Sequence, residues 1–219
     1  MPLLDVLLPR RCLVCGQVAE ELCGRCLAAL PRLPPPFCER CGAPTGWPVR
    51  RCGECTGRRL AFASARAAVA YDPVVRVLVA GWKEQGRRHV ASLAAGVVTA
   101  TVHRPAADAL VPVPADAERR ARRGHSPAAR LAAQLGARWE LPVRDVLVRR
   151  PGPRQRGLPV AERRRNVRAA FRAVASAPAR VVLVDDVYTT GSTAAAAASA
   201  LRRAGETRGE VVTFARAVR

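Results

Sequence analysis

The chain has 219 residues, of which 49% are hydrophobic, so it can form one large domain or two smaller ones with a core. Its formal charge of +20 at pH 7 favours anionic partners: nucleic acid, phosphorylated metabolites or an anionic membrane surface. Only 4% of the residues are aromatic, which leaves few side chains on which single-stranded nucleic acid could stack. Charge alone therefore does not indicate a nucleic-acid-binding protein, because a solvated arginine-rich surface has the same charge.

No segment has the pattern of a secretory signal or a membrane span. The apolar stretch Leu3–Leu8 is interrupted by Asp5 and is too short for the core of a signal peptide. The longest other apolar run, Val90–Val102, falls well short of the roughly 20 residues that a spanning helix needs. We therefore expect a soluble, cytoplasmic protein.

All the cysteines lie near the start of the chain, in four C-x-x-C pairs. Each pair places two thiolates on one tight turn, and two such turns that face each other complete a tetrahedral zinc site. The spacing predicts two zinc ribbons in tandem, separated by the proline-rich spacer Pro31–Pro36. The expected zinc ligands are two quartets: Cys12, Cys15, Cys23 and Cys26, then Cys38, Cys41, Cys52 and Cys55.

Other uses of these cysteines fit the sequence less well. A disulfide framework needs an oxidising compartment, and no signal for export is present. A thioredoxin-like redox site needs one C-x-x-C pair in a βαβ context, not four in a segment rich in Gly and Pro. With four thiolates each, neither zinc site keeps an open position for catalysis. We expect a double zinc ribbon at residues 1–60 and a second domain at 61–219.

Strands and helices alternate through the second domain, which predicts a parallel, doubly wound sheet with helices on its faces. Pro73 follows Asp72 as the first residue of a helix, and Gly86 ends that segment. The expected strands are residues 61–71, 110–114, 144–148, 181–184 and 211–215, and the expected helices are residues 73–82, 90–102, 127–139 and 194–204.

The stretch 181–193 carries the strongest functional pattern. The apolar residues Val181–Val184 predict a buried parallel strand, which we expect to end at the acidic pair Asp185 and Asp186. A short loop of Thr, Gly and Ser follows and leads into a helix. Ligands bind open α/β sheets where strands end and helices begin, and the amides of such a loop favour anions. Two carboxylates beside an anion site suit a phosphorylated sugar.

This stretch resembles the phosphoribosyl-pyrophosphate (PRPP) motif of type I phosphoribosyltransferases. The resemblance implies that Asp185 and Asp186 hold the ribose 2′- and 3′-hydroxyls and serve as the catalytic carboxylates. It also implies that the loop holds the 5′-phosphate. The implied PRPP-binding residues are Asp185, Asp186, Val187, Tyr188, Thr189, Thr190, Gly191, Ser192 and Thr193. A strand, a turn and a capped helix without a ligand would show the same local pattern.

Nearly the whole chain is similar to the ComF family of competence proteins, whose members join a zinc-binding segment to a phosphoribosyltransferase-like domain. The matching features, in chain order, are the C-x-x-C pairs, Lys83 with Gly86-Arg87-Arg88, Val111-Pro112-Val113-Pro114, Arg119, Arg123-Gly124, Gln155, Gly157-Leu158, Glu162 to Val167, Phe171 and the acidic pair. The resemblance therefore implies a type I phosphoribosyltransferase-like fold preceded by a double zinc ribbon.

Two positions depart from the family's usual pattern. Glu118 precedes Arg119 where the family usually has Lys, and Gly124 is followed by His-Ser-Pro where Phe-Asn-Gln is usual. This loop lies where a phosphoribosyltransferase would hold pyrophosphate, and a glutamate there would repel it. PRPP-type binding is thus better supported than transfer to an acceptor.

If the protein is a transferase, its catalysis is positioning and charge stabilisation, and no covalent nucleophile is needed. Mg²⁺ would neutralise the pyrophosphate, chiefly through oxygens of the ligand. Arg119 and Arg123 are candidates to clamp pyrophosphate. The basic loop 149–168 could close over the ligand with Gln155, Arg163 and Asn166, or could be a solvated basic segment. No pattern identifies an acceptor base or an oligomeric state.

The alternative is a non-catalytic protein of DNA uptake, as the family's link to natural competence implies. Its basic surface and zinc ribbons would then contact single-stranded DNA or the uptake machinery. The composition gives one further observation: Lys83 is the only lysine among 37 basic residues in an arginine-rich chain. Its persistence indicates either a role that arginine does not fill or chance.

Overall fold

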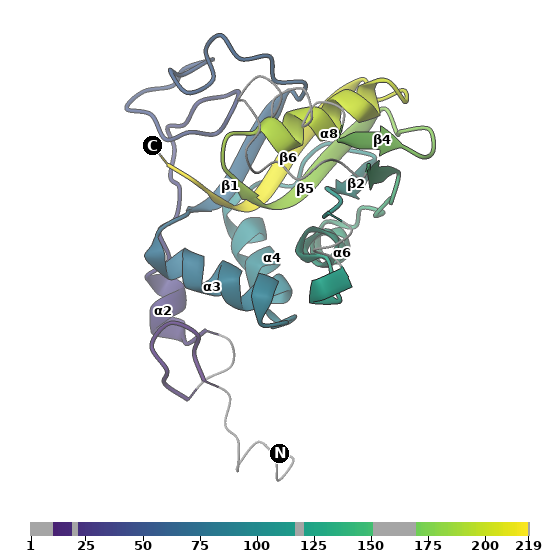
Figure 1. Ribbon diagram of the computed structural model, residues 1–219. Helices are drawn as coiled ribbons and strands as arrows, with labels where there is room; N and C mark the ends of the chain where they lie inside the picture. The colour runs from purple at the N-terminus through teal and green to yellow at the C-terminus, as the bar shows by residue number, and fades with distance from the viewer. Residues whose placement is uncertain (1–10, 19–21, 117–120, 151–169, 219) are drawn as a thin grey trace, which may run out of the picture.

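The protein is described here by a computed structural model, which covers residues 11–18, 22–116, 121–150 and 170–218 (Figure 1). The strands are β1 (Ser64–Ala70), β2 (Ala109–Pro112), β3 (Leu147–Arg149), β4 (Phe171–Ala173), β5 (Arg180–Tyr188) and β6 (Arg208–Arg216). The helices are α2 (Gly24–Ala28), α3 (Pro73–Glu84), α4 (Val90–Thr101), α6 (Pro127–Trp139) and α8 (Ser192–Arg202).

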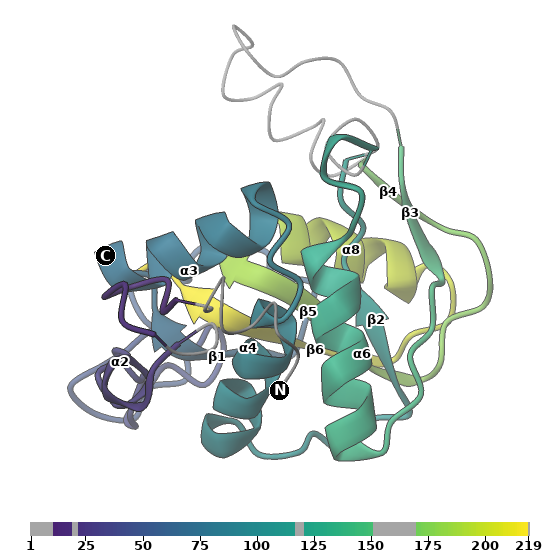
Figure 2. The same cartoon turned by 90° about the horizontal axis from the view of Figure 1, so that it is seen from below.

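Four strands form one parallel sheet in the order β1-β6-β5-β2. Helices α3, α4 and α6 cover one face of this sheet and α8 covers the other (Figures 1 and 2). The predicted parallel sheet with helices on both faces is therefore confirmed. Strand β5 is hydrogen-bonded to β2 on one side and to β6 on the other. Its residues Val181–Val184 are at most 1% exposed, as their uninterrupted apolar run predicts.

Two helices begin where their capping residues predict. The Asp72 side chain accepts a hydrogen bond from the Val75 amide at 2.7 Å, and Pro73 follows as the first residue of α3. Ser126 and Pro127 repeat this arrangement at α6, where the serine Oγ accepts from the Ala129 amide at 3.3 Å. The remaining expected helices are also present, with α8 beginning two residues earlier than predicted.

The acidic pair does not end the central strand, as the sequence led us to expect. Strand β5 continues through Asp185 and Asp186 to Tyr188, because its backbone keeps pairing with β6: Asp185 lies opposite Thr213 and Tyr188 opposite Arg216. Backbone ladder bonds do not depend on side-chain polarity, so a strand in the middle of a sheet can carry carboxylates.

The strand expected at residues 144–148 is not part of the parallel sheet. The Arg144 amide bonds to the Leu110 carbonyl at 2.9 Å, which is one of two contacts with the edge of β2. The chain then leaves that edge, and β3 pairs with β4 as a separate antiparallel ribbon. The partner strand, β4, follows the undescribed segment 151–169, so this pairing is not local in sequence.

The cysteines of the two ribbons belong to hydrophobic clusters on opposite faces of the sheet. Cys12 and Cys26 share one cluster with α3, α4 and the sheet face that these helices cover. Cys38, Cys41 and Cys55 share the other cluster, with α8 and the opposite face. The spacer between the ribbons runs beside β1, where the Ala70 amide donates to the Pro31 carbonyl at 2.8 Å. The domain boundary near residue 60 stays a prediction.

Within the described ranges, none of the helices combines the length and apolarity that crossing a bilayer requires.

Two helical glycines, one in α6 and one in α4, provide a test of how these helices pack. A Cβ on Gly136 of α6 would lie 2.8 Å from the Leu141 carbonyl oxygen, which is backbone and cannot turn away, whereas a Cβ on Gly96 of α4 would have no atom within 4 Å. We expect Gly136→Ala to lower the free energy of unfolding by about 1–3 kcal/mol. Gly96→Ala should raise it by about 0.5–1 kcal/mol through the unfolded state. Urea unfolding of the zinc-loaded proteins measures both, and equal effects would contradict the packing described.

Candidate functional site

The two adjacent carboxylates lie near the carboxyl end of the central strand. The Asp186 carboxylate forms an ion pair with the Lys83 ammonium, with Oδ1 and Nζ 2.7 Å apart and side chains 12% and 25% exposed. Lys83 lies in the last turn of α3, so one helix end is held against the acidic pair. Sequence reasoning did not assign this contact, although Lys83 stood out as the only lysine.

The environment of Asp185 opposes its ionisation. Burial of its carboxyl group, and then the charge of Asp186, raise the pKa of Asp185 from 3.8 to about 7. The Asp186 amide acts in the other direction, because it donates to Asp185 Oδ1 at 2.9 Å. Titratable groups held out of their ordinary range by burial are typical of binding and catalytic sites.

The loop after β5 leads directly into the amino-terminal end of α8. Gly191 adopts φ +71°, a left-handed conformation that other residues rarely adopt, and it is the residue before α8. The hydroxyls of Thr190 and Ser192 lie 2.9 Å apart, and the Ser192 amide donates to Thr190 Oγ1 at 3.4 Å. The predicted residues Asp185 to Thr193 thus run from the last residues of β5 through the loop to the positive end of α8.

The second ribbon reaches this loop. Arg58 Nη2 lies 3.5 Å from Ser192 Oγ, so an arginine of the cysteine-rich segment is next to the first residue of α8. The Tyr188 ring, at the start of the loop, packs edge-on against Phe62, with ring centroids 6.3 Å apart. Neither contact was predicted from the sequence, because each joins segments that are far apart along the chain.

Of the residues predicted to bind pyrophosphate or to close over the ligand, only Arg123 is described. Its guanidinium pairs with Glu84, the neighbour of Lys83, and this contact lowers the pKa of Glu84. His125 Nε2 lies 2.9 Å from the Trp82 carbonyl oxygen and holds the same turn against α3. The candidates Arg119, Gln155, Arg163 and Asn166 lie outside the described residues, and their roles stay predictions.

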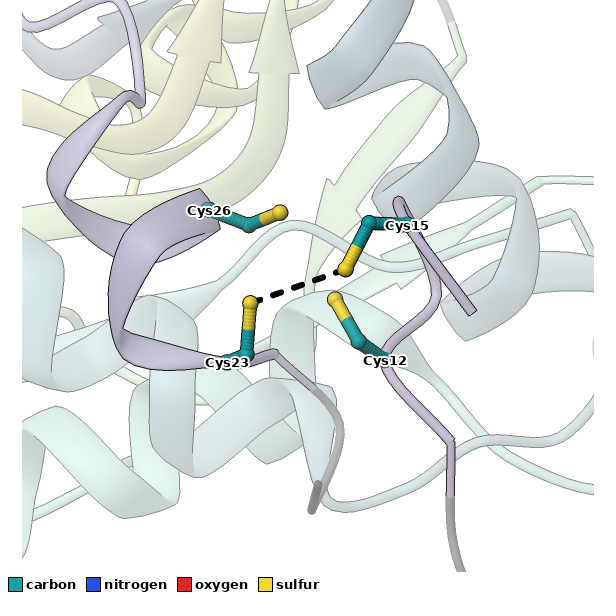
Figure 3. Close-up of side chains that lie close together, drawn as sticks. All are labelled: Cys12, Cys15, Cys23 and Cys26. Carbon is teal, nitrogen blue, oxygen red and sulfur yellow. Dashed lines mark hydrogen bonds between the residues drawn. The ribbon is translucent and has the colours of Figure 1, made fainter. Parts of the chain in front are cut away.

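The eight cysteines form the two predicted quartets, each with its ligand atoms within 4.8 Å of one another. Figure 3 shows the first quartet, in which the four side chains converge and the sulfurs of Cys15 and Cys23 are 3.6 Å apart. In the second quartet, the Cys38–Cys55 and Cys41–Cys52 sulfurs are 3.7 and 3.5 Å apart. Zinc–sulfur bonds of about 2.3 Å would place the sulfurs of a tetrahedron about 3.8 Å apart. Both quartets therefore fit zinc.

The two quartets differ in exposure and in their surroundings. Cys15 of the first quartet is exposed, whereas Cys38, Cys41 and Cys55 of the second are at most 2% exposed. Burial raises the pKa of Cys41 and Cys55, so these thiols hold their protons more tightly until a metal displaces them. We expect metal binding to release protons from both of these thiols.

The raised pKa of Asp185 predicts a stability that depends on pH. Between pH 4 and 7 the folded protein binds a proton that the unfolded chain releases, so this contribution to stability is complete below pH 4 and lost as pH rises through 7. Asp185→Asn removes the buried charge. It should raise the free energy of unfolding by about 1–3 kcal/mol at pH 8 and leave it nearly unchanged at pH 4.

Asp108→Asn is the matched control, because the exposed ion pair with Arg180 lowers the pKa of Asp108. This variant should lose a little stability at pH 8 instead of gaining any. Urea unfolding at the two pH values tests both variants. An Asp185→Asn protein no more stable than the parent at pH 8 would show that Asp185 is not held in an unfavourable environment.

Comparisons with known proteins cover both parts of the chain. Residues 3–56 match the model of the double zinc ribbon domain, which identifies the quartets as two zinc-binding sites of four cysteines each. The structural neighbours include a PRPP amidotransferase from B. subtilis, at 25% identity and a TM-score of 0.41 over 57% of this chain and 26% of that one. Another is the orotate phosphoribosyltransferase of Aeropyrum pernix, at 21% identity and a TM-score of 0.35 over 69% and 68%.

Two relatives match most of the chain. Competence protein F of Haemophilus influenzae is 29% identical over 94% of this chain and 97% of its own length. DNA utilization protein YhgH of Salmonella typhi is 31% identical over 84% of this chain and 85% of its own. With this identity along nearly the full length, and with a double zinc ribbon before a parallel α/β sheet, the chain belongs to the ComF family of competence proteins.

Proposed function

We propose that the protein binds PRPP, or a related phosphoribosyl ligand, together with Mg²⁺ at the carboxyl end of β5. One observation carries the proposal: a buried strand carries two adjacent carboxylates near its end and continues into a glycine-containing loop that begins a helix. A ligand with a diol next to a phosphate has the groups that this arrangement can bind.

Each group of the proposed site can bind a different part of the ligand. The carboxylates of Asp185 and Asp186 accept hydrogen bonds, as the ribose 2′- and 3′-hydroxyls require. The loop Thr189–Thr193 offers backbone amides and hydroxyls to the 5′-phosphate. Carboxylate oxygens are also the ligands that Mg²⁺ prefers, and the ion, when bound with the ligand, neutralises pyrophosphate charge.

The same carboxylates would assist transfer to an acceptor. Displacement at the ribose C1 builds up positive charge on the sugar, and two neighbouring carboxylates stabilise that charge without forming a bond to it. Lys83 opposes this effect while it is paired with Asp186, so we expect ligand binding to change the contact between them. The proposal assigns no acceptor base.

A second candidate function is DNA handling without catalysis, which the names of the relatives favour. One surface feature supports it. In the part of the chain that the structure describes, a cavity of about 430 Å³ between the β3–β4 ribbon and the end of α8 has Arg150, Arg172 and Arg203 among its lining residues and no acidic residue there. Such a groove complements the phosphates of a nucleic-acid backbone.

Calorimetric titration of zinc-loaded protein with PRPP and Mg²⁺ tests the proposed function. We expect saturable binding by the parent and a loss of about 100-fold or more in the Asp185→Ala/Asp186→Ala variant, because several hydrogen bonds to charged groups are removed. Asp108→Ala, an exposed acid at the other end of the sheet, is the control and should bind as the parent does.

Absence of binding by the intact, zinc-loaded protein would refute the PRPP proposal. The double variant also separates the two candidates. A protein that only handles DNA would bind it as well or better without the two acids, and its affinity would fall steeply with salt.

A further inference from the structure

Arg216, the last residue of β6, is a buried arginine that the proposed function does not use. It is 1% exposed, and its guanidinium contacts the second cysteine-rich ribbon. Nη1 donates to the Cys41 carbonyl at 2.6 Å, and Nη2 lies 2.6 Å from Glu54 Oε2 and 3.8 Å from Cys41 Sγ. An N–H group directed at a ligand sulfur is a typical outer contact of a metal–thiolate site.

The same guanidinium lies against Tyr188, the last residue of β5. The Arg216 Cζ atom is 4.7 Å from the ring centroid, and the two residues face each other in the register of the sheet. The ring is thus held between Arg216 and the edge-on ring of Phe62. This arrangement restricts where the tyrosine hydroxyl can lie.

The hydroxyl of Tyr188 lies against the loop glycine. A Cβ placed on Gly191 would lie 2.2 Å from Tyr188 Oη and 2.6 Å from Cζ, so the ring and the glycine backbone are in direct contact. The position of the ring therefore fixes the turn from which α8 begins. Arg58 adds a direct contact between the ribbon and this turn through Ser192.

We propose that Arg216 and Tyr188 are positioning residues that couple zinc binding in the second ribbon to phosphoribosyl binding by the loop. The inference rests on the proposed function. Zinc at the second quartet fixes Cys41 and its carbonyl, Cys41 fixes Arg216, and Arg216 fixes the tyrosine ring against the loop. Thermodynamic linkage makes this coupling reciprocal: if zinc at this quartet raises the affinity for the ligand by some factor, the ligand raises the affinity for zinc by the same factor.

The first quartet is an internal control. Its cysteines lie in the hydrophobic cluster on the opposite face of the sheet, with α3 and α4. The side-chain partners of Arg216 among the described residues, Cys41, Glu54 and Tyr188, all lie outside that ribbon. A ligand effect confined to the second quartet therefore indicates the route through Arg216 and not a general stiffening of the protein.

The test uses full-length protein in which ¹¹³Cd replaces zinc, so that each quartet gives its own cadmium NMR signal, with Cys52→Ser identifying that of the second. We expect PRPP with excess Mg²⁺ to shift the second signal and to raise the cadmium affinity of that quartet by about tenfold in equilibrium competition with a chelator, which corresponds to a typical coupling. The signal and the cadmium affinity of the first quartet should not change.

Tyr188→Leu is the decisive variant, because it keeps every contact of Arg216 with the ribbon. At a PRPP concentration that saturates the variant in calorimetry, it should retain parental metal content and lose both the signal shift and the gain in cadmium affinity. Arg216→Gln should also lose both effects, but it should hold less metal. Arg208→Gln, an exposed arginine on the same strand that pairs with Glu210, is the matched control and should behave as the parent does.

The outcomes separate the inference from the proposed function. If the cadmium-loaded parent binds PRPP in calorimetry but the second cadmium signal does not shift, the coupling is wrong and the proposed function stands. The same conclusion follows if Tyr188→Leu keeps the coupling. No binding by the parent overturns both. A shift of both cadmium signals would mean that the effect is not carried by Arg216 and would also overturn the inference.

Discussion

Strand β5 is hydrogen-bonded to β2 on one side and to β6 on the other, and this central position fixes where its acidic pair can lie. Neighbouring strands exclude water from Val181–Val184, while the continuing ladder carries Asp185 and Asp186 to the carboxyl end of the sheet. A carboxyl group held there loses hydration, which is why the pKa of Asp185 rises to about 7. Keeping that carboxyl group ionised in the folded protein therefore costs free energy.

The zinc ribbons are joined to the same framework. Each ribbon contributes cysteines to a hydrophobic cluster on one face of the sheet, so neither is an appendage tethered only by the chain. The two attachments differ in chemistry. The first ribbon contacts the layer of α3 and α4 through apolar side chains, whereas the second also contacts β6 through the buried charge of Arg216 and its partner Glu54. Only the arginine of this pair is fully buried, so removal of Glu54 would leave a buried charge without its acidic partner, and the pair favours a single arrangement of ribbon and sheet.

Local features of the chain were predictable because local chemistry determines them. The Asp72-Pro73 and Ser126-Pro127 pairs mark helix starts, and each provides the cap of its helix. The pairs of cysteines predict both quartets for the same reason: each C-x-x-C turn is local. The glycine at position 191 also has the left-handed conformation that a turn between strand and helix needs.

Contacts between distant segments were not predictable from the pattern. Lys83 meets Asp186, and Arg216 meets Glu54, only because the sheet and its helices bring those segments together. The pairing of β3 with β4 has the same origin, since its strands flank a long segment of the chain. The end of β5 differs from the sequence prediction for another reason: polar side chains at Asp185 and Asp186 suggest a strand end, but the pairing of the backbone with β6 decides where the strand ends.

Binding of phosphoribose by the end of β5 and the loop after it is tested most directly by ³¹P NMR of PRPP titrated with zinc-loaded protein and Mg²⁺. The three phosphorus atoms of PRPP give separate signals, so the measurement identifies which phosphate the protein binds. We expect the 5′-phosphate signal to shift, and the shift to disappear in the Asp185→Ala/Asp186→Ala variant. A change confined to the pyrophosphate signals, or a 5′-phosphate shift that survives loss of both acids, would contradict this expectation.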